Sequence, residues 1–422
     1  MRSLRWLLVA TIVLGAPIAW AAGFRVGIAV RNVTPEPLLP VSGGVGPSHA
    51  TTKKQGELTV RALVFESGSN RVALVVGDFL GFPAVLGDRV RAAVPGVPPE
   101  NIVIGATHTH SAPDCYGFPD GRGGTGADFK YLERVCVQAA EAITEAVTRL
   151  QPAGLRIATG EARGQIAYNY YAEKLYDARC HVVQAVDAAG KSVATLVNYA
   201  IHPEVIGSER GICSPDLVGP LCDRIAEGGG GTGIFLNSAL GGMVTADNRR
   251  PGGGEANDWA ECQRIGRLLA DEALRIVQNA PVQAEPTLFC AARRLTLPVD
   301  SPLMRQLLSA IPGARDMAGT GDQVVTRLNL INVGNAQLLT IPGEALPNIG
   351  CYLKRKMRGE HNLLFGLAND ALGYIMAKED YDSFKRYEYI SRTSLGERTG
   401  VIFVEEALKL VGESPAPQVL AD

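Results

Sequence analysis

The chain has 422 residues, and its 41 basic and 43 acidic side chains give a formal net charge of −2 at neutral pH. This balance provides no electrostatic basis for binding nucleic acid, which needs an excess of lysine and arginine. The eight cysteines are too few for a disulfide scaffold in a chain of this length. We expect one to three disulfides, with Cys213–Cys222 as the candidate pair on sequence proximity alone.

The first 21 residues have the features of a secretory signal peptide. Arg2 and Arg5 precede an apolar stretch from Trp6 to Trp20, and Ala21 follows as a small residue. The stretch contains Pro17 and is shorter than the about 20 apolar residues that span a membrane. We therefore expect cleavage after Ala21 and a secreted or periplasmic protein. Residues 22–412 are interpreted as a single domain, and residues 413–422 as a flexible tail.

Hydrophobic patterning predicts strands that alternate with helices along the mature chain. In chain order we expect strands at 58–66, 71–77 and 101–106, a helix at 129–150, strands at 154–160, 179–187 and 192–198, a helix at 216–227, a strand at 233–237, a helix at 258–279, strands at 287–297, 324–333 and 336–341, a helix at 345–357, a strand at 362–367 and a helix at 402–411. Short turns between neighbouring strands require antiparallel pairing beside the helical crossovers. The expected fold class is α/β, with layered mixed β-sheets and flanking helices. A polar loop at 312–323 is a candidate flap.

Several of the predicted strands end in side chains that can bind a metal or exchange a proton. These side chains are His108 and His110 after strand 101–106, His202 after 192–198, Glu344 after 336–341 and Asp78 after 71–77. Residues two apart in an extended segment point the same way, so His108 and His110 can face one cavity. We therefore expect a single shared site, in which Asp78 either orients a metal-bound histidine or caps a turn.

The remaining histidines are expected to have structural positions. His181 lies inside the predicted strand 179–187, while His49 and His361 lie in polar segments and are expected at the surface.

The residue types at the strand ends favour a catalytic metal. Two or three imidazoles with one carboxylate are the ligand set of catalytic zinc, which keeps one position open for water. The sequence has no Cys-x-x-Cys pair of the kind that marks structural zinc. Calcium prefers clustered oxygen ligands to histidines. Zn²⁺ is therefore the expected cofactor, with iron, nickel and copper as alternatives that also suit these ligands.

Five segments of the chain resemble the motifs of neutral, non-lysosomal ceramidases. They are Ala-Thr-His-Thr-His-Ser-Ala-Pro at 106–113, Asn-Tyr-Ala-Ile-His-Pro at 198–203, Pro-Gly-Glu at 342–344, Leu-Ala-Asn-Asp-Ala-Leu-Gly-Tyr-Ile at 367–375 and Arg-Tyr-Glu at 386–388. The resemblance implies a zinc-dependent hydrolase that cleaves the N-acyl bond of ceramide or a related lipid. Its partner would be a small-molecule or lipid substrate.

The resemblance also assigns roles to individual residues. It implies that zinc is held by His108, His202, Glu344 and Tyr374, that His110 acts in catalysis beside the metal, and that Tyr387 contacts the substrate amide. Independently of the resemblance, Asn237 and Asn369 follow apolar runs and are candidate substrate-binding residues in the pocket.

A basic cluster at residues 354–358 could bear on partners. It is most simply interpreted as a solvated helix end that complements the helix dipole. The alternative is a transient contact with an anionic membrane surface. The sequence does not indicate an oligomeric state.

The chain also departs from the ceramidase pattern. The family has a serine, proposed to be catalytic, in a segment that corresponds to residues 241–248, where Thr245 is the only hydroxyl and Ser238 lies too early. We also expect this chain to lack the β-sandwich domain that follows the catalytic domain in ceramidases. The missing serine favours direct attack by metal-activated water, with His110 as the proton carrier.

Three functions therefore remain open. They are a ceramidase, a zinc hydrolase for another amide or ester such as an acylated sugar or a peptide-like substrate, and a non-catalytic relative.

Overall fold

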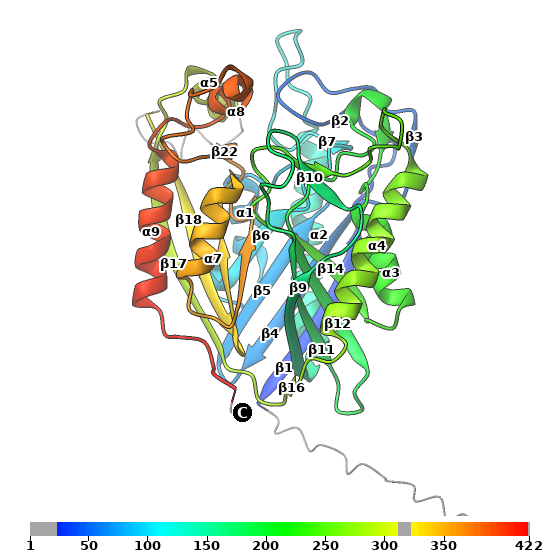
Figure 1. Ribbon diagram of the computed structural model, residues 1–422, viewed down its shortest axis with the longest axis vertical. Helices are drawn as coiled ribbons and strands as arrows, with labels where there is room; N and C mark the ends of the chain where they lie inside the picture. The colour runs from blue at the N-terminus through cyan, green and yellow to red at the C-terminus, as the bar shows by residue number, and fades with distance from the viewer. Residues whose placement is uncertain (1–22, 311–321, 421–422) are drawn as a thin grey trace, which may run out of the picture.

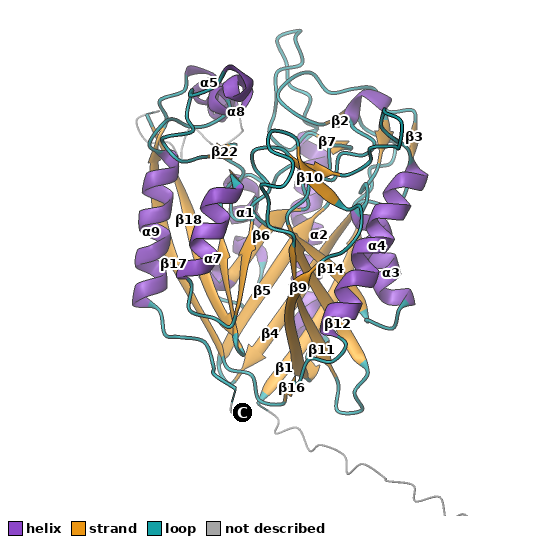
Figure 2. Ribbon diagram, viewed as in Figure 1, coloured by secondary structure: helices purple, strands orange, loops and turns teal. Residues whose placement is uncertain are grey.

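The computed structural model describes residues 23–310 and 322–420 (Figure 1). Three larger β-sheets form the centre of the molecule, and most of the helices lie on their outer faces (Figure 2). The predicted signal peptide at residues 1–21 and most of the predicted flap at 312–323 lie outside the described residues.

Each of the three sheets combines antiparallel neighbours with one parallel pair. The first has the order β6-β5-β4-β1-β8, with β1 (Phe24–Asn32), β4 (Thr59–Ser67), β5 (Asn70–Gly77), β6 (Ile102–Ala106) and β8 (Gln151–Pro152). The second is β14-β12-β11-β9-β16, with β9 (Gly154–Glu161), β11 (Arg179–Val186), β12 (Ser192–Tyr199), β14 (Thr232–Asn237) and β16 (Val282–Gln283). The third is β17-β18-β19-β21, with β17 (Leu288–Pro298), β18 (Gln323–Val333), β19 (Ala336–Thr340) and β21 (His361–Phe365). The parallel pairs are β5–β6, β12–β14 and β19–β21.

The helices cover the outer faces of these sheets. On the first sheet lie α1 (Ala84–Ala93) and α2 (Phe129–Thr148), on the second α3 (Val218–Glu227) and α4 (Trp259–Val277), and on the third α7 (Pro347–Lys356) and α9 (Thr399–Glu413). Two shorter helices, α5 (Pro302–Ala310) and α8 (Glu388–Arg392), lie together at one end of the molecule (Figure 1).

Both faces of the central strands are buried. In β5, Leu74 and Val76 face a core that all three sheets share, while Ala73 and Val75 face the helices outside the first sheet. A strand buried on both sides has no polar face, which explains why these segments appear in the sequence as continuous apolar runs.

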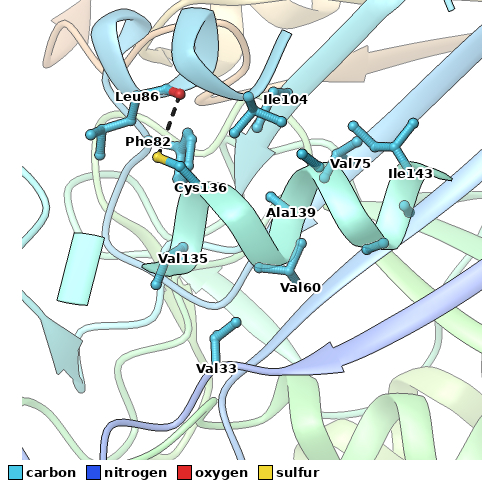
Figure 3. Close-up of a cluster of buried hydrophobic side chains, with 14 of the residues drawn as sticks. Val33, Val60, Val75, Phe82, Leu86, Ile104, Val135, Cys136, Ala139 and Ile143 are labelled. Carbon is cyan, nitrogen blue, oxygen red and sulfur yellow. Dashed lines mark hydrogen bonds between the residues drawn. The ribbon is translucent and has the colours of Figure 1, made fainter. Parts of the chain in front are cut away.

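Helix α2 is held against the first sheet by the apolar side chains of one helix face. Val135, Ala139 and Ile143 recur every four residues and lie against Val60 and Val75 of the first sheet (Figure 3). Asp128 caps the helix, since its side chain accepts a hydrogen bond from the backbone N–H of Tyr131. The helical periodicity of the apolar positions is thus the signal that predicts this helix.

The predicted elements are confirmed, with end points that differ by at most three residues. The prediction misses β1, α1, α5 and α8 and several two- or three-residue strands. The missed helices are short, or, like α1, have arginines within an otherwise apolar pattern. Among residues 23–310 and 322–420, no helix has the length and hydropathy needed to cross a membrane.

Three smaller predictions are wrong. Lys354, expected in a solvated helix end, is buried, because its ammonium group pairs with Asp177 inside the protein. His361, expected at the surface, has a side chain only 14% exposed. All eight cysteines lie among the described residues and are free thiols, so the predicted Cys213–Cys222 disulfide does not form.

Candidate metal centre

His108 follows β6 in a backbone conformation that non-glycine residues seldom adopt. Its φ is 73°, in the left-handed region, and its N–H donates to the carbonyl of Phe79 at 2.9 Å. The side-chain Nδ1 lies 2.6 Å from the carbonyl oxygen of Leu80. Because a carbonyl can only accept, Nδ1 carries the proton and Nε2 presents a lone pair. This arrangement is typical of a metal-binding histidine.

His202, which follows β12, is oriented in the same way. Its Nδ1 donates to the carbonyl oxygen of Val244 at 2.8 Å. Its Nε2 is buried and has no hydrogen-bond partner among the described residues. This nitrogen therefore also presents a lone pair.

Glu344, which follows β19 of the third sheet, brings a carboxylate to these two histidines. Its Oε2 lies 3.2 Å from Nε2 of His202 and 3.6 Å from Nε2 of His108. This oxygen, too, is buried without a hydrogen-bond partner among the described residues. Buried polar atoms are almost always satisfied, so acceptors that face one another call for a cation between them. The donor set therefore fits a divalent metal ion of the zinc type.

Two glycines allow the backbone around Glu344 to approach neighbouring segments closely. Glu344 begins β20 (Glu344–Ala345), which pairs with β22 (Tyr374–Ile375). A Cβ at Gly343 would lie 2.5 Å from the carbonyl oxygen of Gly373, and one at Gly241 would lie 2.2 Å from that of Glu344. Neither close approach would be available to a residue with a side chain.

His110 lies beside the cluster and faces a second carboxylate. Its Nε2 is 3.3 Å from Nε2 of His108, and its Nδ1 is 3.5 Å from Oε2 of Glu204. Ligand atoms of His108, His110 and His202 all lie within 4.8 Å of one another. The geometry thus permits His110 either as a further ligand or as an acid–base group next to the metal.

Glu204 is a site residue that the sequence analysis missed. The signal was present, because Glu204 lies two residues after His202 in the same His-Pro-Glu segment. Its carboxylate holds the His110 imidazole in place and would stabilise the cation formed when that ring takes up a proton.

Electrostatics favour neutral rings at His108 and His110 and one positive charge between His202 and Glu344. Burial, assisted by neighbouring histidines, lowers the pKa of His108 to about 3 and that of His110 to about 3. Burial also disfavours the His202 cation, but Glu344 and Glu204 outweigh burial and raise its pKa to about 9. The histidines in turn lower the pKa of Glu344 against the effect of burial. A cation, either a proton or a metal ion, is therefore stabilised beside Glu344.

Tyr374 lies directly opposite Glu344 in the β20–β22 register. Its ring is buried, and its hydroxyl donates to the sulfur of Met243 at 3.4 Å. Burial and the charge of Glu344 raise the pKa of Tyr374 well above 10. The phenol is therefore protonated without a metal. Its role as a ligand, which needs metal-assisted loss of that proton, stays a prediction.

Asn237 links the two segments that carry His108 and His202. Its amide nitrogen donates to the carbonyls of Thr107 at 3.0 Å and Ile201 at 2.7 Å, which precede His108 and His202. Asn237 is fully buried and is not among the described residues that line the cavities. The expected substrate contact is therefore not supported, because the amide is committed to joining the two loops.

Asn369 and Asp78 are likewise engaged elsewhere. Asn369 accepts from the Arg91 guanidinium at 2.7 Å and lines a separate cleft on the protein. Its expected contact with substrate at the metal centre is not supported. Asp78 accepts from the backbone N–H and the hydroxyl of Thr59, both at 2.8 Å, and thus stabilises a strand end without touching His108.

Two cavities meet at the metal centre. The narrow pocket, about 70 Å³, is lined by His108, His110, Glu344 and Tyr374 together with apolar side chains. The wide chamber, about 600 Å³, is lined by His110, Tyr374 and Glu204 together with mostly polar side chains. His110 and Tyr374 line both, so the metal centre lies at their junction.

Tyr387 is displaced from this junction. Its ring packs against those of Tyr171 and Phe384, with centroids 5.0 and 5.5 Å apart, and is not among the described lining residues. Tyr389, which the sequence analysis missed, lines both cavities instead. Within the segment that contains the Arg-Tyr-Glu motif, the tyrosine that lines the cavities thus comes two residues after Tyr387.

The two hydroxyl residues considered as nucleophiles have different environments. Thr245, in β15 (Val244–Ala246), pairs with His202 and lines the wide chamber. Ser238 is buried, and its hydroxyl has no hydrogen-bond partner among the described residues. Only Thr245 therefore borders the space that a substrate could enter.

The fold is shared with solved structures of ceramidases. The crystal structure of neutral ceramidase from Pseudomonas aeruginosa aligns with a TM-score of 0.74 and 19% identity, over 95% of this chain and 77% of that one. A second structure, described as ceramidase complexed with C2, aligns with a TM-score of 0.72, the same identity and the same coverage. The sequence matches no protein-family model and no curated protein. These likenesses show a neutral ceramidase-like fold, which confirms the fold expected from the sequence motifs.

Proposed function

We propose that this protein is a zinc-dependent amidohydrolase that cleaves an N-acyl bond of a lipid-like substrate. One observation carries the proposal. Nε2 of His202 and Oε2 of Glu344 are buried 3.2 Å apart, and both are without other partners among the described residues. Glu344 lines the narrow pocket, next to His110 and Tyr374, which line both cavities. The ceramidase-like fold supports the same class of reaction.

The residues that would hold zinc are His108, His202 and Glu344, with Tyr374 as the candidate fourth ligand. When bound, zinc would polarise the substrate carbonyl and acidify a water molecule. No serine is needed in the segment 241–248 for this route.

His110 would move the proton. Its Nε2 faces the ligand cluster, and its Nδ1 faces Glu204, as in other orienting carboxylate–histidine pairs. In the proposed reaction the water oxygen bonds to the acyl carbon, His110 takes the water proton, and the C–N bond breaks. The proton then passes from His110 to the departing nitrogen, so the products are a carboxylic acid and an amine. Transfer of the acid proton to the amine gives a carboxylate and an ammonium ion at neutral pH.

We also propose that the protein is exported. The support is the sequence of residues 1–21, in which arginines precede an apolar stretch and a small residue. Fractionation of cells that express the full chain, with N-terminal sequencing of the product, tests this. We expect the mature protein outside the cytoplasm and starting at Ala22.

The function is tested with a panel of N-octanoyl amines that includes sphingosine, glucosamine and an amino acid. We expect hydrolysis of at least one member, its loss after treatment with a chelator and its return when zinc is added. Glu344→Gln is the matched variant, because it preserves shape while removing the charge. Hydrolysis that persists after metal removal, or no hydrolysis of any member by the zinc-loaded protein, would contradict the proposal.

A further inference from the structure

The two cavities offer different surroundings to the two sides of a scissile amide. Gly43, His110, Tyr374 and Tyr389 line both, so a bond that reacts at His110 lies at the boundary between them. The acyl side of the substrate must then extend into one cavity and the amine side into the other. The lining of each cavity indicates which side it receives.

The narrow pocket suits an alkyl chain. Beyond the metal centre its walls are largely apolar, with Leu80, Phe118, Met304, Leu307 and Ala371 among them. Its small volume of about 70 Å³ matches a slender group better than a branched or cyclic one. Burying methylene groups here gains roughly 0.8 kcal/mol each.

The wide chamber suits a polar group. Its walls include Glu204, Ser208, Arg210, Asn248, Glu255 and Asn257, while its apolar side chains are limited to Val205, Ile206 and Met243. Side chains of both charge types, with amide and hydroxyl groups between them, can pair with a ligand rich in hydroxyl groups. A second alkyl chain would displace water from these groups without replacing its hydrogen bonds, which is unfavourable.

Tyrosine rings at the wide chamber add a surface for a flat or cyclic group. Tyr170 is 64% exposed and lines the wide chamber. It directly follows β10 (Ala167–Asn169), whose Tyr168 also lines the chamber. An aromatic face that is open to solvent can pack against the apolar face of a sugar ring while the hydroxyls of the ring bind the polar walls. The volume of about 600 Å³ accommodates such a ring.

We propose that the substrate is a single-tailed N-acyl amine with a hydroxyl-rich polar headgroup, of which an N-acyl amino sugar is the simplest example. The acyl chain occupies the narrow pocket, and the headgroup occupies the wide chamber. This inference rests on the proposed amidohydrolase function and narrows its substrate class. It also separates this protein from an enzyme for ceramide, whose amine side carries a long alkyl chain.

The direct test compares N-octanoyl-glucosamine with N-octanoyl-sphingosine, which share one acyl chain and differ in the headgroup. With the zinc-loaded protein we expect kcat/KM to be at least about tenfold higher for the sugar, equivalent to roughly 1.4 kcal/mol. Equal values, or a preference for the sphingosine amide, would overturn the inference while leaving the amidohydrolase function intact. Hydrolysis of neither substrate would instead defeat the proposed function, and the inference with it.

A variant of the wide chamber locates the headgroup. Asn257 lines only that chamber and contacts Asn248, whose amide nitrogen lies 2.5 Å from its Oδ1. Asn257→Leu is expected to raise KM for the sugar amide several-fold and to change kcat by less than twofold. Leu307→Asn, in the narrow pocket, is the matched control and should raise KM for both amides. A lower KM for the sugar amide in Asn257→Leu would contradict the assignment.

Inhibition of the wild-type protein by its products tests the same assignment without any variant. Octanoate and glucosamine should inhibit the wild-type protein together, because the inferred sites are separate cavities. At subsaturating concentrations their combined inhibition should then exceed that of two inhibitors that exclude each other. Mutually exclusive inhibition would show that both products use one cavity and would overturn the inference.

Discussion

Two buried clusters in this protein combine histidine with an acidic residue, and they differ in whether their polar atoms are satisfied. The metal centre contains His108, His202 and Glu344. The lysine cluster, as we name it, consists of Lys354 on α7, Asp177 before β11, His181 on β11, Thr159 on β9 and His361 on β21. Both are enclosed by the protein, so burial alone does not distinguish a functional site from a structural one.

The lysine cluster forms a continuous chain of hydrogen bonds. Lys354 Nζ lies 3.0 Å from Oδ2 of Asp177 and 2.9 Å from Nε2 of His181. His181 Nδ1 donates to the hydroxyl of Thr159 at 2.8 Å, and that hydroxyl donates to Nδ1 of His361 at 2.9 Å. Burial, together with the Lys354 charge, lowers the pKa of His181 well below its usual value, so the ring is neutral and fits this chain. The cluster therefore joins the second and third sheets.

The metal centre has no such continuous chain of hydrogen bonds among the described residues. Nε2 of His202 and Oε2 of Glu344 face each other with no hydrogen-bond partner among residues 23–310 and 322–420. The comparison teaches that unsatisfied acceptors, rather than histidine and carboxylate as such, distinguish a candidate cation site from a structural cluster.

The largest effect is expected when one histidine is removed from each cluster, which tests whether only the metal centre binds a metal ion. His202→Ala should lose bound metal and reduce turnover at least on the order of a thousandfold, because a ligand is removed. His181→Ala, its matched control in the lysine cluster, should keep the metal. Metal content and kcat of the two variants are the measurements. Equal metal loss in both would show that the two clusters do not differ as described.

The second prediction separates the two histidines of the 106–113 segment. His110→Ala should keep the metal and reduce kcat by roughly a hundredfold or more, the usual contribution of a general acid–base group. His108→Ala should lose the metal. If His110→Ala loses as much zinc as His108→Ala, His110 is a ligand and the proton transfer needs another group.

The third prediction concerns the stability that the lysine cluster provides. Lys354→Met should lower the free energy of unfolding by about 3 kcal/mol, since it leaves Asp177 partly buried with Arg179 alone as its charged partner. Lys409→Met breaks an exposed pair with Glu406 and should leave the unfolding free energy nearly unchanged. Urea unfolding measures both. A similar cost for the two variants would remove the structural role assigned to Lys354.

The smallest effect is expected at the hydroxyl side chains of the glycine-rich segment. Thr245→Val and Ser238→Ala should each keep kcat within about tenfold, or about 1.4 kcal/mol, because attack by metal-activated water needs no side-chain nucleophile. A covalent acyl-enzyme on either residue, or a thousandfold loss, would establish a nucleophilic route.

The sequence predicts the sheets and the metal-centre residues because both leave local signals. Strands buried on two faces appear as apolar runs, and the ligands follow those runs directly, as His108 follows β6 and His202 follows β12. The core shared by the three sheets, with β14 in contact with both β6 and β21, then brings their ends together. The sequence pattern at the strand ends and the arrangement of the sheets indicate the same place, so the position of the candidate metal centre could be predicted.

The positions that the sequence could not place have side chains whose partners are distant in sequence. Lys354 is 177 residues from Asp177, and Asn369 is 278 residues from Arg91, so nothing local reveals that either is buried and paired. Asn237 follows an apolar run like a ligand does, yet its amide joins two loops. Such positions become distinguishable only when the three-dimensional contacts are known.

The most direct test of the account is the metal content of the purified wild-type protein, measured by elemental analysis after dialysis against zinc and then against metal-free buffer. Because one set of facing acceptors is present in His108, His202 and Glu344, we predict about one zinc per chain. Glu344→Gln, treated in the same way, should retain far less. Less than a tenth of an equivalent in the wild-type protein would contradict the central claim that this cluster is a metal centre.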